Sequence, residues 1–232
     1  AFMTETDIAN IRGNYNLPGY NTHYPLHEQT DSKPPNKIRI IAVTKDDSAT
    51  TYKLRTDLMS KEIPTIWIEL RTEKGKKHLV GGFYREWNNN GDTTIEGQVR
   101  RIEILTSQID RACSECKRVV VVGDANLCAE SWDNNTYHLR RISSILRGTL
   151  TQNNLTIQKL GKTFHANHPD VNGKYASSAL DHAYVSDLCE ILTAKALDNS
   201  GTDHYPILIS IRTFDGKNKP YTRFIMKRSY RG

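Results

Sequence analysis

Apolar residues recur along the chain with two different periods, which predict strands in some segments and helices in others. Four consecutive valines, Val119–Val122, predict a short buried strand. In 65–70 the apolar residues occupy alternate positions, as they do on one face of a half-buried strand. A turn at 74–76 and an apolar segment at 78–84 then predict that this strand continues into a hairpin.

Other segments have the spacing of helices. In 95–116 and 136–150, apolar residues lie three and four positions apart, which is typical of amphipathic helices. The polar segment 21–36, which contains several prolines, predicts a loop. Further short strands are predicted at 37–43, 155–159, 182–185 and 207–211. Strands joined mostly by hairpins, together with two helices, indicate a mixed α and β fold of packed sheets flanked by helices.

The length and composition fit an ordinary globular protein. The 232 residues suit one large α/β domain or two small ones. No apolar stretch approaches the roughly 18 residues that a membrane helix requires, and we expect no membrane association. The sequence shows no secretory signal, and its four cysteines are too sparse for a disulfide framework. We therefore expect an intracellular, reducing compartment, in which the lone Cys113-x-x-Cys116 pair is structural.

The net charge of +6 is concentrated at one end of the sequence. Residues 212–232 contain seven basic residues and one acidic residue, which sum to +6, so residues 1–211 are neutral overall. This basic tail is equally consistent with a linker that attracts polyanions and with a solvated tether. Any affinity of residues 1–211 for nucleic acid has to come from local basic patches.

Polar residues with catalytic potential follow the valine strand. Asp124 and Asn126 emerge directly after it, where α/β sheets tend to place their sites, and residues two apart in extended chain point the same way. An Asx turn is the alternative, because Gly-Asp-x-Asn is also good turn chemistry. Two Asp-His pairs, at 181–182 and 203–204, supply carboxylates for a divalent cation and imidazoles for a scissile phosphate. The combination predicts a metal-assisted phosphodiesterase.

Six short motifs occur in the order that they have in one known superfamily. They are Thr4-Glu5-Thr6, Leu17-Pro18-Gly19-Tyr20, Gly81-Gly82-Phe83-Tyr84-Arg85, Gly123-Asp124-Ala125-Asn126, Ser178-Ala179-Leu180-Asp181-His182 and Thr202-Asp203-His204-Tyr205-Pro206. On these motifs the chain resembles the endonuclease/exonuclease/phosphatase superfamily. Within it, the chain is most similar to the endonuclease domain of non-LTR retrotransposon polyproteins.

The resemblance implies a four-layer α/β/β/α sandwich over residues 1–211, in which two packed mixed sheets are flanked by helices. Residues 212–232 would form a basic linker or tail. The implied activity is a DNA endonuclease that hydrolyses a phosphodiester and nicks the target strand to leave a 3′-hydroxyl. The implied context is a longer polyprotein with a downstream reverse transcriptase, and hence a nuclear location.

The same resemblance assigns five catalytic residues. Asp124 aligns or deprotonates the attacking water, and Asn126 orients that water or the phosphate. His204 contacts the scissile phosphate while Asp181 fixes its tautomer, and Tyr84 forms a hydrogen bond at the phosphate. The residues leave open whether His204 or Asp124 accepts the proton, and a half-buried strand aromatic is the alternative for Tyr84.

The resemblance also implies a metal and a set of DNA contacts. Mg²⁺, with Mn²⁺ as the alternative ion, would be held by the carboxylates of Glu5 and Asp203. Without the resemblance, Glu5 is an ordinary surface carboxylate near a chain end. Candidates for contact with DNA are Arg85, Arg140, Arg141 and Thr163. Charged residues on a helix face are equally explained by solvation.

One departure from the family pattern is visible in the sequence. The family opens with a strand that carries an asparagine, whereas only four residues precede Glu5 here. We therefore expect the first strand to be missing, a sheet edge to be exposed and metal binding to be weakened. Two alternatives stay open. One is another phosphoesterase on the same scaffold, such as an abasic-site endonuclease or an inositol or lipid phosphatase. The other is a catalytically dead fragment that binds nucleic acid.

Overall fold

A computed structural model of the protein describes residues 1–8, 17–26, 38–46, 50–72, 76–86, 94–131, 137–198, 202–213 and 222–226. The strands are β1 (Phe2–Ile8), β2 (Tyr20–His23), β3 (Ile38–Lys45), β4 (Thr50–Leu54), β5 (Thr65–Thr72), β6 (Lys77–Tyr84), β7 (Val119–Asp124), β8 (Leu155–Ile157), β9 (Phe164–His165), β10 (Ser177–Ser178), β11 (Asp181–Ser186), β12 (Ile191–Ala196), β13 (Ile207–Ile211) and β14 (Thr222–Met226). The α-helices are α1 (Ile95–Glu115) and α2 (Tyr137–Gln152), and short 3-10 helices cover Thr56–Leu58 and Ala129–Ser131.

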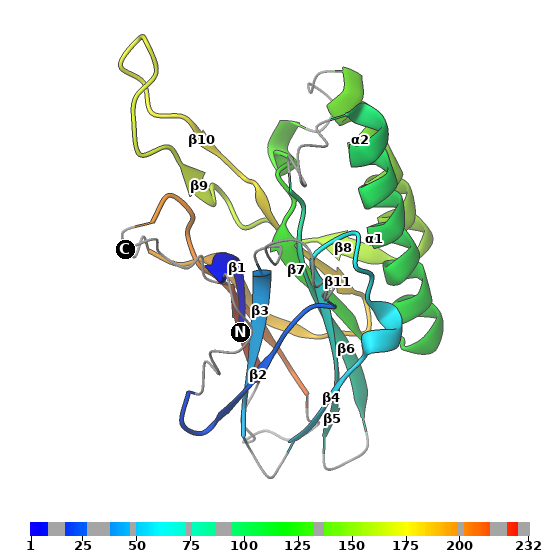
Figure 1. Ribbon diagram of the computed structural model, residues 1–232. Helices are drawn as coiled ribbons and strands as arrows, with labels where there is room; N and C mark the ends of the chain where they lie inside the picture. Colours follow the sequence, from blue (N-terminus) through cyan, green and yellow to red (C-terminus); the bar gives the residue numbers. More distant parts are fainter. Residues whose placement is uncertain are drawn as a thin grey trace, which may run out of the picture.

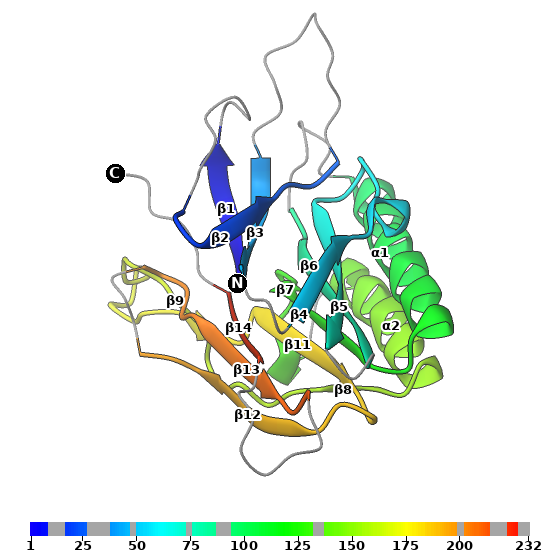
Figure 2. The ribbon, with the colours of Figure 1, turned by 90° about the horizontal axis from the view of Figure 1, so that it is seen from below.

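Two six-stranded sheets pack against each other (Figures 1 and 2). The first sheet has the order β12-β13-β14-β1-β3-β2, and the second has the order β4-β5-β6-β7-β11-β8. Both sheets are mixed, because β1 and β14 are parallel in the first and β6 and β7 are parallel in the second. The mixed α/β fold class expected from the sequence is therefore confirmed.

Both described helices cover the outer face of the second sheet (Figure 1). Helix α1 begins after Thr94, whose hydroxyl accepts a hydrogen bond from the Gly97 amide at 3.0 Å and so caps the first turn. Helix α2 packs against α1 and contacts β8. Within the described ranges, no helix covers the outer face of the first sheet, so these residues show three of the four layers of the expected sandwich. None of the described helices is long and apolar enough to span a membrane.

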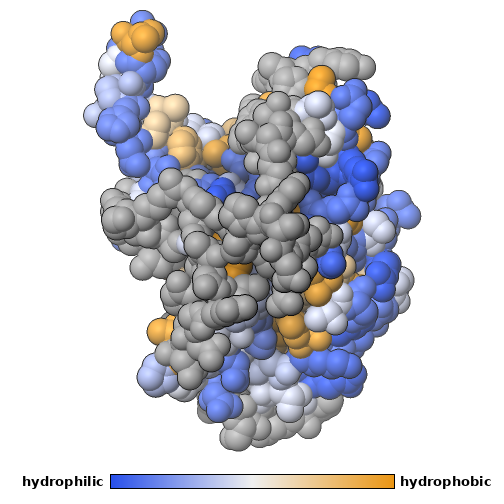
Figure 3. Space-filling view, viewed as in Figure 1, coloured by the Kyte–Doolittle hydropathy of each residue, from blue (hydrophilic) through white to orange (hydrophobic). Residues whose placement is uncertain are grey.

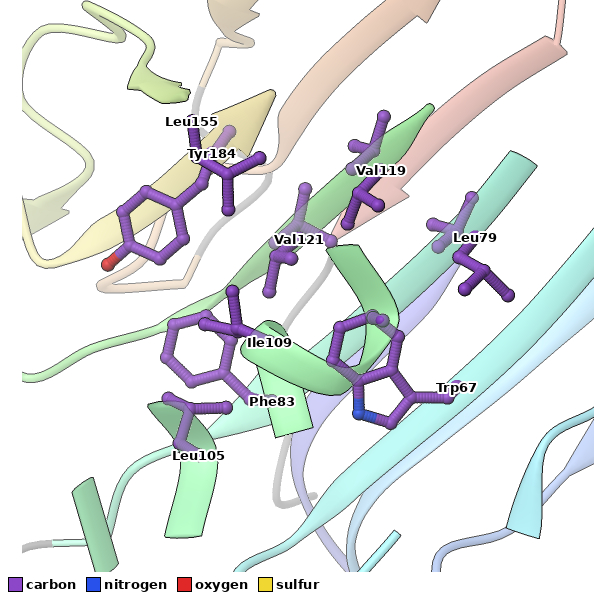
Figure 4. Packing of buried hydrophobic residues seen from close by; sticks show 14 of the residues in the cluster. Trp67, Leu79, Phe83, Leu105, Ile109, Val119, Val121, Leu155 and Tyr184 are labelled. Carbon is purple, nitrogen blue, oxygen red and sulfur yellow. The ribbon is translucent and has the colours of Figure 1, made fainter. Parts of the chain in front are cut away.

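The core lies on both faces of the valine strand, and Figure 4 shows the packing between this strand, its neighbours and helix α1. Val119 to Val122 are all buried, as the unbroken apolar run predicts for a central strand covered on both faces. On the helix side, Trp67 packs among aliphatic residues and donates a hydrogen bond from its indole nitrogen to Gln108 Oε1 at 3.0 Å. The rings of Phe83 and Tyr184 stack with centroids 6.1 Å apart. The site described below is built on this rigid layer.

The tail predicted at 212–232 contributes a strand to the fold. Residues 222–226 form β14, which lies between β13 and β1 in the first sheet. Strand β1 therefore has neighbours on both sides, and the exposed edge that the sequence analysis expects beside it is occupied. A domain boundary at residue 211 stays a prediction, and residues 214–221 and 227–232 lie outside the described residues.

Candidate active site

Three candidate residues form a row across neighbouring strands of the second sheet. In the register of the strands, Tyr84 at the end of β6 lies opposite Asp124 at the end of β7, and Asp124 lies opposite Asp181 at the start of β11. Residues opposite one another in adjacent strands share a face of the sheet. All three are buried, so the row places two carboxylates and a phenol close together at one edge of the core.

His204 joins this row through Asp181. Its Nδ1 lies 2.7 Å from Asp181 Oδ2, and both residues are buried. The edge-on ring of Phe164, at 5.0 Å between centroids, holds the imidazole from a second side. Because the carboxylate accepts a hydrogen bond from Nδ1–H, the neutral ring carries its proton there and presents Nε2 as an acceptor.

Potential metal-ligand atoms of Asp124, Asp181 and His204 lie close together. One ligand atom from each residue lies within 4.8 Å of the others, and these residues form the one such group in the described part of the chain. Two carboxylates and an imidazole suit a divalent cation. The carboxylate oxygens suit Mg²⁺ in particular, because Mg²⁺ is usually held by one or two carboxylates together with water and substrate phosphate.

Asn126 lies next to this group in a tight turn. Its φ of 48° is left-handed, and its amide donates a hydrogen bond to Asp124 Oδ1 at 2.9 Å. The two explanations considered for this motif therefore apply together, since the Asx turn is present and it lies at the site. Asn126 also donates from Nδ2 to the backbone oxygen of Arg85 at 2.8 Å.

Glu5 approaches the row from the first sheet. It has a φ of 53° and lies where the pairing of β1 with β3 is irregular, a feature that redirects side chains. Its Oε1 accepts a hydrogen bond from the Tyr84 hydroxyl at 2.5 Å. Burial, followed by the charge of Glu5, raises the pKa of Tyr84 above its usual value, so the phenol is a neutral donor at physiological pH.

The second predicted metal ligand, Asp203, directly precedes His204 of the hydrogen-bonded Asp181–His204 pair (the dyad), but it contributes no atom to the group of Asp124, Asp181 and His204. Asp203 is half-buried, and its backbone oxygen accepts a hydrogen bond from the His165 amide at 2.7 Å. Glu5, likewise, is not part of the group formed by Asp124, Asp181 and His204. A metal-binding role for Glu5 and Asp203 stays a prediction.

Two residues predicted to contact DNA are instead internal. Arg85 is 1% exposed and Thr163 is 0% exposed, so neither side chain reaches a ligand on the surface. The Thr163 hydroxyl accepts a hydrogen bond from the Asp181 amide at 2.9 Å, and the Arg85 guanidinium binds backbone oxygens of the 125–126 turn. Both side chains support the site from within, which does not favour direct contact with DNA, and the DNA contacts of these two residues stay a prediction.

The other two predicted DNA contacts lie on the surface. Arg140 and Arg141 are exposed in the first turns of α2. Their accessibility is compatible with phosphate binding and with solvation alike. A contact of these arginines with DNA stays a prediction.

A charged pair near Tyr84 was missed by the sequence analysis. Arg39 on β3 donates from Nη2 to the Tyr84 hydroxyl at 3.1 Å, and its Nε lies 2.9 Å from Glu86 Oε1. Burial raises the pKa of Glu86, an effect that the nearby Arg39 opposes. The available signal was an arginine between Ile38 and Ile40 in an apolar strand, which indicates that something inside the fold receives its charge.

His182 is a strand residue, as expected. Its Nε2 donates to the backbone oxygen of Leu127 at 2.7 Å and its Nδ1 accepts from the Tyr184 hydroxyl at 2.6 Å. Complete burial lowers the pKa of His182 to about 4, so the ring is neutral at physiological pH. The contact with Leu127 ties β11 to the loop that follows Asn126.

A protruding arm lies beside the dyad. Strands β9 and β10 pair with each other, and the first of them meets His204 through a bridge at Phe164. The arm extends beyond the body of the molecule at the upper left of Figures 1 and 3, and Val171 and Tyr175 in it are exposed. The end of the arm is hydrophobic in Figure 3.

Comparison with solved structures supports this fold at low sequence identity. The endonuclease domain of TRAS1, a telomere-specific non-LTR retrotransposon, is similar with a TM-score of 0.63 and 18% identity, covering 84% of this chain and 81% of that one. An AP endonuclease from Archaeoglobus fulgidus is similar with a TM-score of 0.58 and 13% identity, covering 93% of this chain and 88% of that one. The catalytic domain of Xenopus laevis APE2 is similar with a TM-score of 0.61 and 12% identity, covering 90% of this chain and 82% of that one.

Comparison of sequences identifies the family. No curated protein is significantly similar to the chain in sequence. The family model described as endonuclease-reverse transcriptase matches residues 82–208, which is more than half of the 232 residues. This range contains Tyr84, Asp124, Asn126, Asp181 and His204. The chain belongs to the endonuclease-reverse transcriptase family and has the fold of endonuclease/exonuclease/phosphatase nucleases.

Proposed function

We propose that the protein is a Mg²⁺-dependent DNA endonuclease that hydrolyses one phosphodiester of a target strand and leaves a 3′-hydroxyl. The observation that carries this proposal is the buried group of Asp124, Asp181 and His204 at one edge of the core. Buried carboxylates are costly unless they serve a ligand or a partner. Tyr84 and Asn126 lie beside this group, so a phosphate and the attacking water could bind next to each other there.

The side chains divide the chemistry between them. His204, with its tautomer fixed by Asp181, presents Nε2 toward substrate, either as an acceptor for the proton of water or, when protonated, as a donor to the phosphate. Asp124 is the second candidate for the base. Tyr84 is a neutral donor whose hydroxyl is already oriented by Glu5 and Arg39. If Glu5 bound the metal ion, the Tyr84 hydroxyl could donate its hydrogen bond to a phosphate oxygen instead of to Glu5.

The proposed metal would be held by carboxylates at this edge. Asp124 and Asp181 supply oxygens that converge, and Glu5 and Asp203 are the further candidates. When bound, Mg²⁺ neutralises charge on the phosphate and the leaving oxygen. Mn²⁺, which accepts the same ligands, is expected to substitute for it.

Several features of the chain support a nucleic acid as the substrate. The arm of β9 and β10 lies next to His204 and offers exposed Val171 and Tyr175. Arg140 and Arg141 lie at the start of α2, and residues 212–232 hold the whole net positive charge of the chain. Basic residues such as these give affinity for the DNA backbone that falls with salt and specifies no sequence.

The family supports a retrotransposon context for the cut. Members are described as endonuclease-reverse transcriptases, and the TRAS1 domain comes from a non-LTR retrotransposon. A 3′-hydroxyl in the target strand would serve as the primer for a reverse transcriptase in the same polyprotein. A nuclear location follows from this role.

A second activity is favoured by the structural comparisons. Two of the similar structures are an AP endonuclease and APE2, so cleavage beside an abasic site is the alternative on this fold. A phosphatase for small phosphoesters and a catalytically dead binding fragment are less well supported. The intact buried group of Asp124, Asp181 and His204 argues against the latter.

A comparison of substrates tests the proposal. The purified protein with Mg²⁺ is given supercoiled plasmid, a duplex with one abasic site, and inositol phosphates. We expect nicked circles whose ends are extended by a polymerase without further processing. Preferred cleavage of the abasic duplex would support the alternative activity. Turnover of inositol phosphates alone, or of none of the substrates, would contradict the proposal.

A further inference from the structure

Arg85 is a buried cation whose guanidinium binds the turn that follows β7. It follows Tyr84 directly and is 1% exposed. Its guanidinium donates from Nε to the backbone oxygen of Ala125 at 2.5 Å, from Nη2 to that of Asn126 at 2.8 Å, and from Nη1 to Gln98 Oε1 at 3.2 Å. Two of these acceptors belong to the turn that carries Asp124 and Asn126.

The main chain of Arg85 holds the same turn. Its amide donates to the backbone oxygen of Asp124 at 2.9 Å, and its own backbone oxygen accepts from Asn126 Nδ2 at 2.8 Å. Arg85 therefore bonds to each of the three residues of the turn. A planar guanidinium with fixed donor directions is suited to hold several acceptors at once, which an ammonium group cannot do.

The turn needs such support because it is strained. Asn126 has a φ of 48°, and a residue other than glycine in this region costs about 1 kcal/mol. Burial lowers the pKa of Arg85 to about 10, an effect that the charge of Asp124 opposes, so the cation is itself costly. An apolar side chain would fill the same volume at lower cost, but it would leave the backbone oxygens of Ala125 and Asn126 without these donors.

We propose that Arg85 is a positioning residue that fixes the side-chain amide of Asn126 in the orientation used for hydrolysis. The proposal rests on the proposed nuclease function and specifies the role of Asn126 within it. Because Nδ2 of Asn126 is bound to the backbone oxygen of Arg85, the amide presents Oδ1 on its other side. Oδ1 can accept a hydrogen bond from the attacking water, whereas an ionised phosphate oxygen has no hydrogen to donate to it, so we assign Oδ1 of Asn126 to the water.

The proposed orientation of the Asn126 amide can be tested without an enzyme assay. In the NMR spectrum of the wild-type protein, the side-chain amide protons of Asn126 should exchange with solvent slowly compared with those of exposed Asn167. Arg85→Lys keeps the charge and the backbone oxygen but loses the planar fork that holds the turn, so the Asn126 signals should shift and exchange faster than in the wild type. Equal exchange of Asn126 and Asn167 in the wild type would overturn the proposal, whatever the fate of the variants.

Kinetics then separate positioning from stability. Arg85→Lys and Arg85→Met should lower kcat for nicking about 100-fold, because a displacement of about 1 Å in a reacting group has an effect of this size. KM and the Kd for DNA should change by no more than about twofold, since the residue makes no contact with substrate. Addition of guanidinium at low concentration to Arg85→Ala should restore part of kcat, whereas ammonium should not.

A matched control is available at the opposite end of the second sheet. Arg55 is 8% exposed and binds Asp57, Glu69 and Glu115, which are remote in the fold from the 124–126 turn. Arg55→Met should reduce stability while leaving kcat of the folded fraction unchanged. A fall in kcat that is equal in the Arg55 and Arg85 variants, or kcat unchanged in both Arg85 variants, would overturn the proposal. If the wild type does not nick DNA but Asn126 is protected, the proposed function fails and the structural clamp stands.

Discussion

The imidazole of His204 and the carboxylate of Asp181 form a buried pair, with Nδ1 and Oδ2 2.7 Å apart. The two residues are 23 positions apart in sequence. Asp181 begins β11 in the second sheet, and His204 shortly precedes β13 in the first sheet. Their contact joins the two halves of the site. It also assigns Nδ1 of His204 to Asp181, so Nε2 is the nitrogen that we propose faces the substrate.

Asp181→Asn should disrupt this pair with little change of shape. The amide can present a donor to Nδ1 and favour the wrong tautomer, so we expect kcat for nicking to fall by about 10² to 10⁴. DNA affinity should be retained, as measured by fluorescence anisotropy. Asp187→Asn, at an exposed turn beyond the other end of β11, is the control and should nick at the wild-type rate. Equal rates for Asp181→Asn and the control would exclude a role for the pair.

Thr163 does not belong to the buried group itself but supports Asp181, and substitutions of Thr163 test that support. Thr163→Val keeps the shape but removes the acceptor of the Asp181 amide, and a buried donor left without its partner costs about 1–3 kcal/mol. We expect a lower urea midpoint and a reduced kcat. Thr163→Ser retains the hydroxyl and should recover most of both. The assignment fails if the serine and valine variants behave alike.

Gly123 should be intolerant of a side chain for a local steric reason. A Cβ at this position would lie 2.2 Å from the backbone oxygen of Phe83, across the parallel pair of β6 and β7. We expect Gly123→Ala to destabilise the protein by about 3 kcal/mol in urea unfolding. Gly148, exposed in α2 with nothing within 4 Å of a Cβ, is the matched position. Gly148→Ala should stabilise by up to about 1 kcal/mol.

Stability should fall in mild acid because of His182. Its pKa is lowered to about 4 by burial, whereas in the unfolded chain it is near 6.5. The unfolded state therefore binds the proton more readily between these values, and stability decreases as pH falls, by about 1.4 kcal/mol per pH unit for one such group. His78, with its pKa also lowered to about 4 by burial, acts in the same direction.

His182→Gln isolates this effect, because glutamine can still donate to Leu127 but does not titrate. Between pH 6.5 and 5, the wild type should lose about 2 kcal/mol more of its free energy of unfolding than the variant. Urea unfolding at the two pH values measures the difference. Parallel losses in the two proteins would show that His182 is not buried as a neutral ring.

The sequence alone was sufficient to predict the elements with strong periodicity. The valine strand, the hairpin of β5 and β6 and both helices are present within a few residues of the predicted bounds. Weaker elements were missed. Residues 20–23, at the start of a predicted loop, form β2, and β4 and β12 were not predicted because their residues are only partly buried and carry little apolar pattern.

The members of the buried group could be named from the sequence, but their arrangement could not. Short motifs named Asp124, Asp181 and His204 as candidates; the register of β7 and β11 brings the two aspartates together, and a hydrogen bond joins His204 to Asp181. Burial could not be read from the motifs. Arg85 and Thr163 look like surface residues in the sequence, yet each serves a neighbouring catalytic candidate through backbone atoms, and backbone partners leave no trace in residue types.

The central claim is that Asp124, Asp181 and His204 form one hydrolytic centre for DNA. Single-turnover nicking of supercoiled plasmid in Mg²⁺ tests it most directly, with His204→Ala compared with His168→Ala, an exposed histidine in the nearby arm. We predict that the wild type and His168→Ala produce nicked circles at the same rate, that EDTA stops both, and that His204→Ala binds the plasmid without cutting it. Nicking by His204→Ala at the wild-type rate would contradict the account.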